Sequence, residues 1–147
     1  MRLEGTYTLD APRDRVWELL NDPQVLARCT PGIKELEPTE GDTYKAAMEV
    51  GVGPVKGMFQ GKVEVAERRA PEQITLRVQG GGSAGMVRAE GTITLREEGG
   101  RTVLSYTGEA QVSGLIASVG QRMIGSVAKM LADQFFSNLI KEASASR

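Results

Sequence analysis

The sequence predicts an α+β fold in which a curved antiparallel sheet of about seven strands surrounds a long C-terminal helix. Three observations predict it: apolar and polar residues alternate over most of the 147 residues, short turns separate the alternating segments, and a helical pattern occupies the end. Alternation with a period of two is typical of strands with one buried face, and short turns make neighbouring strands antiparallel. Because only one face of the sheet is apolar, we expect the terminal helix to cover that face.

One strand and two short helices are expected first. The apolar or small residues of the strand over 2–9 are Leu3, Gly5, Tyr7 and Leu9, and they alternate with polar ones. The segment "APRDRVWELLNDP" predicts a helix, in which Pro12 suits the first helical position and Asp10 is placed to help cap it. A second short helix is expected over residues 23–28.

Six further strands follow. The segments "TPGIKELE" and "TYKAAMEV" form the first two, and the turns "GVGPVKG", "APEQ" and "EEGGR" separate most of the others. Beyond "TPGIKELE", residues of one parity define the inward face: Tyr44, Ala46, Met48 and Val50; Val55, Gly57, Phe59, Gly61, Val63 and Val65; Ile74, Leu76 and Val78; Val87, Ala89, Gly91, Ile93 and Leu95; and Leu104, Tyr106, Gly108, Ala110 and Val112.

A long helix is expected from Leu115 to about Glu142, because apolar residues recur there at i, i+3 and i+4 spacing. At ~1.5 Å per residue this helix would be ~40 Å long. The chain shows no internal repeat, linker or low-complexity segment, so residues 1–147 are expected to form a single domain.

The composition excludes several classes of function. With 18 basic and 19 acidic residues the net charge is −1, and nothing favours a nucleic-acid partner. The chain has no histidine, which removes histidine-based catalytic systems and nearly all transition-metal sites. A single cysteine, Cys29, allows no internal disulfide and fits a reducing cytosol. We therefore expect no cofactor and no metal, and the lack of a signal peptide or apolar span predicts a cytoplasmic protein.

A glycine-rich stretch raises the question of a nucleotide site. Gly80, Gly82 and Gly85 match G-x-G-x-x-G after a strand-like run. A dinucleotide site needs a helix directly after the glycines, whereas "MVRAEGTITL" alternates with a period of two, and no Lys-Ser/Thr pair marks a P-loop. We interpret the stretch as a loop between antiparallel strands, or as a flexible loop at the mouth of a cavity.

Small residues on the inward parity predict space inside the fold. They are Gly5, Gly57, Gly61, Gly91, Gly108, Ala46, Ala89 and Ala110. Strand bending also explains them, and the two interpretations are compatible because a strongly curved sheet encloses volume. The expected cavity lining is Met48, Phe59 and Tyr106 from the sheet with Ile116, Val119 and Met123 from the helix, although plain core packing is the alternative for each. The expected mouth loops contain Gly53, Pro54, Gly82, Gly85 and Met86.

No catalytic group of residues stands out. The acidic residues with solvent-facing parity are Glu4, Glu49, Glu64, Glu90 and Glu109. Cys29 lacks a histidine partner and is a weak candidate nucleophile. A binding protein without enzymatic activity is therefore the favoured hypothesis. Two alternatives stay open: a cyclase- or lyase-type enzyme that uses the cavity tyrosines Tyr7, Tyr44 or Tyr106, and an assembly or recruitment factor with an incidental core.

Several motifs in order resemble a known family. The run "APRDRVWELLNDPQVLARCTPGIKELE" resembles the opening of the START-related (SRPBCC, helix-grip) superfamily, with its Pro-x-x-x-Val-Trp pattern. More narrowly, "DPQVLARCTPGIKEL", "VGVGPVKGMFQGKVEV", "GGGSAGMVRAEGTITL" and "LADQFFSNL" together resemble the family of the carbon monoxide dehydrogenase G-subunit. The resemblance extends from about Leu3 to Leu139.

The resemblance implies a helix-grip fold with an apolar cavity between the sheet and the long helix. It also implies an accessory role beside a molybdenum hydroxylase of the carbon monoxide dehydrogenase type, whose electrons pass to membrane quinones. The expected partners are therefore a hydrophobic molecule such as a quinone or lipid and the hydroxylase subunits, with the protein a monomer or weak dimer. Some members carry a membrane-anchoring C-terminal extension, whereas this sequence ends in "ASASR". Any contact with the inner face of the cell membrane is expected to be peripheral, through the cavity mouth or a partner.

These expectations make one direct prediction. Met123→Trp should fill the cavity and abolish ligand binding while the fold stays intact. Native mass spectrometry of the variant measures this, and retention of the same bound lipid would contradict the assignment of Met123 to the cavity.

Overall fold

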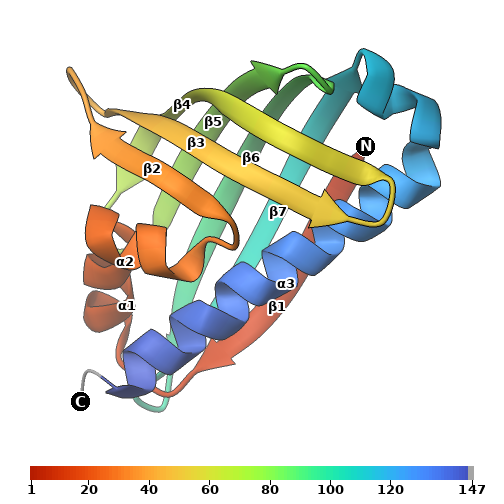
Figure 1. The fold of residues 1–147 in the computed structure, drawn as a ribbon. Helices are drawn as coiled ribbons and strands as arrows, with labels where there is room; N and C mark the ends of the chain where they lie inside the picture. Colours follow the sequence, from red (N-terminus) through yellow and green to blue (C-terminus); the bar gives the residue numbers. More distant parts are fainter. Residues whose placement is uncertain (146–147) are drawn as a thin grey trace.

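The computed structural model describes residues 1–145 and confirms the α+β architecture (Figure 1). Its elements are β1 (Arg2–Leu9), α1 (Arg13–Leu20), α2 (Pro23–Cys29), β2 (Ile33–Pro38), β3 (Thr43–Val52), β4 (Val55–Arg69), β5 (Gln73–Gly82), β6 (Gly85–Glu98), β7 (Arg101–Ser113), the 3-10 turn η1 (Leu115–Val119) and α3 (Gln121–Ala145). Figure 1 shows α3 lying across the concave side of a curved sheet, with α1 and α2 near its C-terminal end and η1 at its start. This order agrees with the prediction of one strand, two short helices, six strands and a final helix.

The sheet is antiparallel throughout, as the short turns predict. Its strand order is β1-β7-β6-β5-β4-β3-β2, so the first strand pairs with the last one and all other neighbours are sequential. The register brings residues of one parity into rows across the sheet. One inward row is Tyr44, Val63, Val78, Ala89 and Ala110, and each member lies opposite the next. The outward glutamates of the sequence prediction are exposed.

The C-terminal half of α3 packs into the larger of two apolar clusters. Leu139 and Ala143 are fully buried and Phe136 is 6% exposed. Around them lie residues of β1, α1, α2 and the adjoining ends of the central strands. A smaller cluster, with Val50, Val55, Ile116 and Val127 as its buried members, lies where the N-terminal half of α3 meets η1 and the β3–β4 turn. The core is therefore divided into two parts along the helix.

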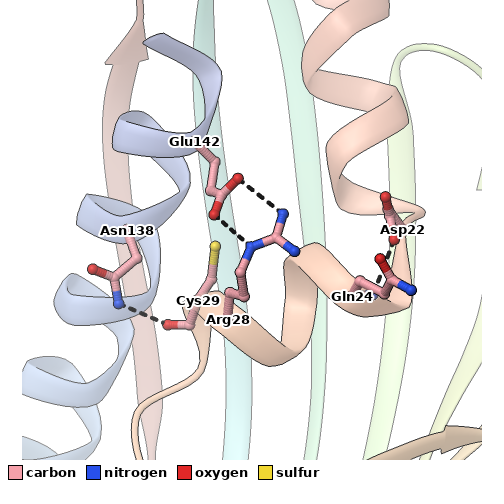
Figure 2. A network of polar contacts seen from close by, with 6 residues as sticks. All are labelled: Asp22, Gln24, Arg28, Cys29, Asn138 and Glu142. Atoms are coloured by element: carbon pink, nitrogen blue, oxygen red, sulfur yellow. Dashed lines mark hydrogen bonds and ion pairs between the residues drawn. The ribbon is translucent and has the colours of Figure 1, made fainter. Parts of the chain in front are cut away.

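Polar contacts fix the same half of α3 to its neighbours (Figure 2). The Arg28 guanidinium in α2 donates two hydrogen bonds to the Glu142 carboxylate, at 2.8 and 3.1 Å, and Asn138 donates to the backbone carbonyl of Cys29 at 3.0 Å. At the same corner the Asp22 carboxylate caps the start of α2 by accepting from the Gln24 amide at 2.9 Å. The contacts of Arg28 and Asn138 join α2 to the long helix.

The terminal helix starts later than the sequence predicts. Leu115 to Val119 form the 3-10 turn η1, and α3 begins only at Gln121. Between them Gly120 has φ +93°, a left-handed conformation that glycine adopts without steric cost and that interrupts a continuous α-helix. The Ile116 amide also donates to the carbonyl of Ala84 at 2.7 Å, which holds η1 against the β5–β6 turn. The start of α1 differs in a smaller way, because Pro12 is its N-cap and has no side-chain capping bond.

The glycine-rich stretch forms the end of the β5–β6 hairpin. Gly82 lies opposite Gly85, and β6 follows directly, so the helix that a dinucleotide site requires is absent at this position. A side chain at Gly85 would collide with the carbonyl of Ser113 and press against Ile116. Glycine therefore allows the hairpin to approach the end of β7 and the start of η1 closely.

Truncation of Leu139 tests the role of the larger cluster. Leu139→Ala should lower the free energy of unfolding by about 2–5 kcal/mol, because it leaves a cavity at a fully buried position. Leu115→Ala is the matched control: Leu115 is 75% exposed, and its removal should change stability by less than about 0.5 kcal/mol. Urea denaturation of both variants measures the difference, and equal losses would contradict this description of the core.

Candidate ligand-binding cavity

A cavity of about 520 Å³ lies between the sheet and α3, in contact with both apolar clusters. The helix contributes Ile124, Val127, Ala128, Leu131, Phe135 and Phe136 to its wall, and the sheet contributes Met48, Phe59, Val63, Val78 and Val112 among others. Leu20, Leu26 and Thr30 from the α1–α2 region line one end. Ligand pockets typically measure about 300–1,000 Å³ and are mostly apolar, so both the size and the lining suit a small hydrophobic molecule.

Small residues meet at one level of the cavity wall, where a Cβ at Gly61 would collide with the β5 backbone at Gln79. Ala46 lies opposite Gly61, and Gly61 lies opposite Gly80, so three neighbouring strands present little side-chain volume at one level. All three of these residues border the cavity. At the level of the large cluster, by contrast, Ile74, Ile93 and Tyr106 form a row of larger side chains, of which Ile74 and Ile93 also border the cavity.

Three of the six expected lining residues lie on the cavity wall. Met48 and Phe59, which face each other across β3 and β4, and Ile116 of η1 line it. Tyr106, Val119 and Met123 are not among the residues that form the wall. Met123 is 40% exposed on the first turn of α3, and Val119 packs against the smaller cluster.

Tyr106 belongs to an aromatic group at the edge of the larger cluster. Its ring stacks on Phe136 and on Tyr7, with centroid distances of 5.0 and 6.3 Å. It turns toward β1 because Gly5 opposite has no side chain; a Cβ at Gly5 would press against the tyrosine ring. The Tyr106 hydroxyl is buried and forms no hydrogen bond within the described part of the chain.

The expected mouth residues lie at hairpin turns beyond the cavity wall. Gly53 and Pro54 form the β3–β4 turn, and Gly82 and Gly85 flank the β5–β6 turn. None of them borders the cavity. Met86, which is 57% exposed, instead borders a polar hollow on the outer face of the sheet, whose cationic members are Lys45, Lys62 and Arg88. A mouth at these two turns stays a prediction.

A polar pair that the sequence pattern does not indicate lies at one end of the cavity. Asn21, which ends α1, and Arg68, near the end of β4, both border it. The Arg68 Nε donates to Asn21 Oδ1 at 2.7 Å, and Nη1 donates to Asp42 Oδ1 at 2.6 Å. Strict alternation along β4 would place Arg68 on the outer face, so sequence reasoning had no signal for it.

A second polar group connects α3 to β1 outside the cavity wall, with Lys129 and Asp133 about half exposed to solvent. The Tyr7 hydroxyl donates to Asp133, and the Lys129 ammonium lies 3.0 Å from the same carboxylate oxygen. Burial and the bond to Asp133 raise the pKa of Tyr7 to about 12, whereas the bonds from Tyr7 and Lys129 lower the pKa of Asp133. A phenol with this pKa stays protonated at neutral pH and is a poor general base. The i, i+4 spacing of Lys129 and Asp133 was the signal that could have revealed their pairing.

Catalytic and metal chemistry find little support in residues 1–145. No group of three or more His, Cys, Asp or Glu side chains there could hold a metal ion. Of the three tyrosines only Tyr44 borders the cavity. Within the same residues, no helix is long and apolar enough to cross a membrane.

A curved sheet, a long covering helix and an apolar cavity between them define a helix-grip protein of the START type. Among solved structures, a START superfamily protein from Mycobacterium smegmatis shares this fold at 14% identity, with a TM-score of 0.78 and coverage of 99% of both chains. The Zhui aromatase/cyclase from Streptomyces sp. R1128 shares it at 19% identity, with a TM-score of 0.76 and coverage of 98% of this chain and 93% of that one.

The particular family follows from the sequence match. Residues 5–144 match the model of the carbon monoxide dehydrogenase G-subunit (CoxG), and the chain belongs to this family. A conserved protein from Geobacillus kaustophilus is 39% identical, with a TM-score of 0.95 and coverage of 99% of this chain and 97% of that one. No curated protein matches the sequence. The family and the fold together support a ligand-binding accessory role in general terms.

The reactivity of Cys29 tests whether this residue can act as a nucleophile. The thiol is fully buried, and burial raises its pKa to about 11. At pH 8 only about one thiol in a thousand would be ionised, so the native protein should react very slowly with a thiol-specific disulfide reagent. In urea one equivalent should react at once. A Thr107→Cys variant, with its new thiol on the exposed outer face, is the control for a fast native reaction; an equally fast reaction of native Cys29 would contradict the prediction.

Proposed function

We propose that this protein binds a hydrophobic small molecule, quinone-like or lipid-like, in the cavity beneath α3. The supporting observation is the apolar volume of about 520 Å³ between the two clusters. A hydrophobic molecule bound there would remove apolar wall surface from water and gain dispersion contacts with that wall.

The proposed biological role is that of an accessory factor for a molybdenum hydroxylase of the carbon monoxide dehydrogenase type. Membership of the CoxG family supports this role, because the family is described as a subunit of that enzyme. A hydrophobic carrier beside such a hydroxylase could deliver or receive its quinone electron acceptor. The location expected from the sequence, cytoplasmic with at most peripheral contact with the membrane, stays a prediction.

An enzymatic function is a second candidate, and the fold shared with an aromatase/cyclase is the observation that favours it. The interior gives it little support. The Tyr7 hydroxyl donates a hydrogen bond to Asp133 and does not border the cavity, and Tyr106 lies within the aromatic cluster. Binding without chemistry therefore has the better support, and an assembly or recruitment factor that binds no ligand is the outcome if extraction finds none.

Mass spectrometry of an organic extract from the purified protein provides the first test. A co-purifying quinone or lipid, present at a substantial fraction of one equivalent, is expected. Extracts that contain no hydrophobic molecule, combined with failure to bind a decyl-tailed benzoquinone added to the purified protein, would contradict the proposed function.

Two tryptophan variants on the same helix locate the site. Ala128 borders the cavity, so Ala128→Trp should fill it and reduce the bound ligand by at least about tenfold through overpacking and lost volume. Met123→Trp is the matched comparison, because Met123 lies five residues earlier on the helix and outside the cavity wall. The Met123→Trp variant should therefore retain the ligand. Native mass spectrometry of both variants measures occupancy. Loss of the ligand in Met123→Trp but not in Ala128→Trp would contradict this location and support the site at Met123 that the sequence predicts.

A further inference from the structure

A β-bulge in β4 turns Arg68 toward the concave side of the sheet. Val65 lies opposite Leu76, but Glu67 lies opposite Thr75, so Ala66 is an extra residue in β4. Beyond this bulge Arg68 lies opposite Ile74, which is only 3% exposed and belongs to the inward face. Without the extra residue Arg68 would share the outer face with Glu64. Bulges commonly redirect a side chain in this way beside functional sites.

Two anchors from different elements hold the redirected guanidinium. Asn21 at the end of α1 accepts from Nε, and Asp42 in the β2–β3 turn accepts from Nη1. The Nη2 amino group forms no hydrogen bond within residues 1–145. The Arg68 side chain is 32% exposed and therefore lies between the cavity and solvent. A fixed guanidinium with a remaining donor is ready to bind an acceptor group, because it loses little side-chain entropy in doing so.

Two other polar side chains on the cavity wall have their donors engaged. The Asn21 amide donates to the Trp17 carbonyl at 2.9 Å, and the Thr30 hydroxyl donates to the Leu26 carbonyl at 2.7 Å. Lys62 also borders the cavity, but it lies opposite Lys45 in an outward-facing row. Among the described residues three cations border the cavity: the N-terminal ammonium of Met1, which donates to the Ala110 carbonyl at 3.0 Å, Lys62 in the outward row, and Arg68, which the bulge turns to the concave side. The α3 side of the cavity is apolar.

We propose that Arg68 binds the polar end of an elongated, otherwise apolar ligand, and that this end group accepts hydrogen bonds, as a carbonyl or a carboxylate does. The inference rests on the proposed function and adds the chemistry and the orientation of the ligand. The guanidinium carries donors only, so it selects acceptors. The apolar part of the ligand extends beneath α3 toward Ile124 and Val127, and the polar end stays near Asn21 and solvent.

Three probes with similar tails test this inference on the full chain: 2-decyl-1,4-benzoquinone with neutral carbonyl acceptors, undecanoate with a carboxylate, and decylbenzene with no acceptor. Isothermal titration calorimetry gives the three dissociation constants. The wild-type protein should bind one or both acceptor probes more tightly than decylbenzene. The probe that binds more tightly shows whether the acceptor group of the ligand is a carbonyl or a carboxylate. Arg68→Leu should weaken the preferred acceptor probe by about tenfold to a hundredfold, the loss of one charge-assisted hydrogen bond, and leave decylbenzene unchanged.

Arg69→Leu is the matched control. Arg69 is the next residue, lies on the outward parity, is 69% exposed and forms an ion pair with Glu67 at 2.5 Å. This variant should keep all three wild-type affinities. If Arg68→Leu fails to fold, Arg68→Gln retains an amide that can bond to Asp42, and its affinity for the preferred acceptor probe should still fall toward that for decylbenzene.

The outcomes separate the two levels of the argument. A wild-type protein that binds none of the three probes overturns the proposed function together with this inference. Binding of decylbenzene as tightly as both acceptor probes, or an acceptor preference that persists in folded Arg68 variants, overturns the role of Arg68 and leaves the hydrophobic cavity as the site.

Discussion

The packing of the C-terminal half of α3 into the larger apolar cluster is the contact on which the rest of the structure depends. Leu139 and Phe136 each contribute roughly 1.5–3 kcal/mol by leaving water. The neighbouring bonds from Arg28 to Glu142 and from Asn138 to the Cys29 carbonyl orient the helix. The cavity borders both halves of this helix, from Ile124 in the first half to Phe136 in the anchored half.

The cavity follows from how the sheet distributes its side-chain volume. Large residues stand under the anchored half of α3, where Ile93 lies opposite Tyr106, and small ones stand further along, where Gly61 lies opposite Gly80. Packing in protein interiors is otherwise close to that of organic crystals. The small residues lie on the sheet side of the cavity, which is the place that we propose for a ligand.

The chemistry of the interior agrees with binding more than with catalysis. Tyr7 and Asp133, which are not among the residues of the cavity wall, are bonded to each other; burial and this bond raise the pKa of the phenol, and the bond lowers that of the carboxyl. Burial also raises the pKa of the Cys29 thiol, as it raises that of Tyr7. The charged group at the cavity end, Arg68, has two fixed partners and suits recognition of an acceptor.

The sequence by itself determined the order of the elements, the antiparallel pairing and the inward face. Alternation, turn residues and helical spacing are local patterns, and the spacing of apolar residues shows directly which side chains are buried. It also placed Met48, Phe59 and Ile116 on the inward side of the fold. Only the tertiary structure decided which inward residues border a cavity and which fill the core: Tyr106 turns over Gly5 into an aromatic stack, a contact between distant strands. Only the tertiary structure also placed Arg68 on the concave side. The one-residue bulge exchanges the inward and outward faces of β4 beyond it, and the alternation before the bulge does not indicate this change. Local periodicity determines which side chains of a strand or helix point inward. The space between the sheet and the helix depends on all the elements that pack there, so it cannot be inferred from local periodicity.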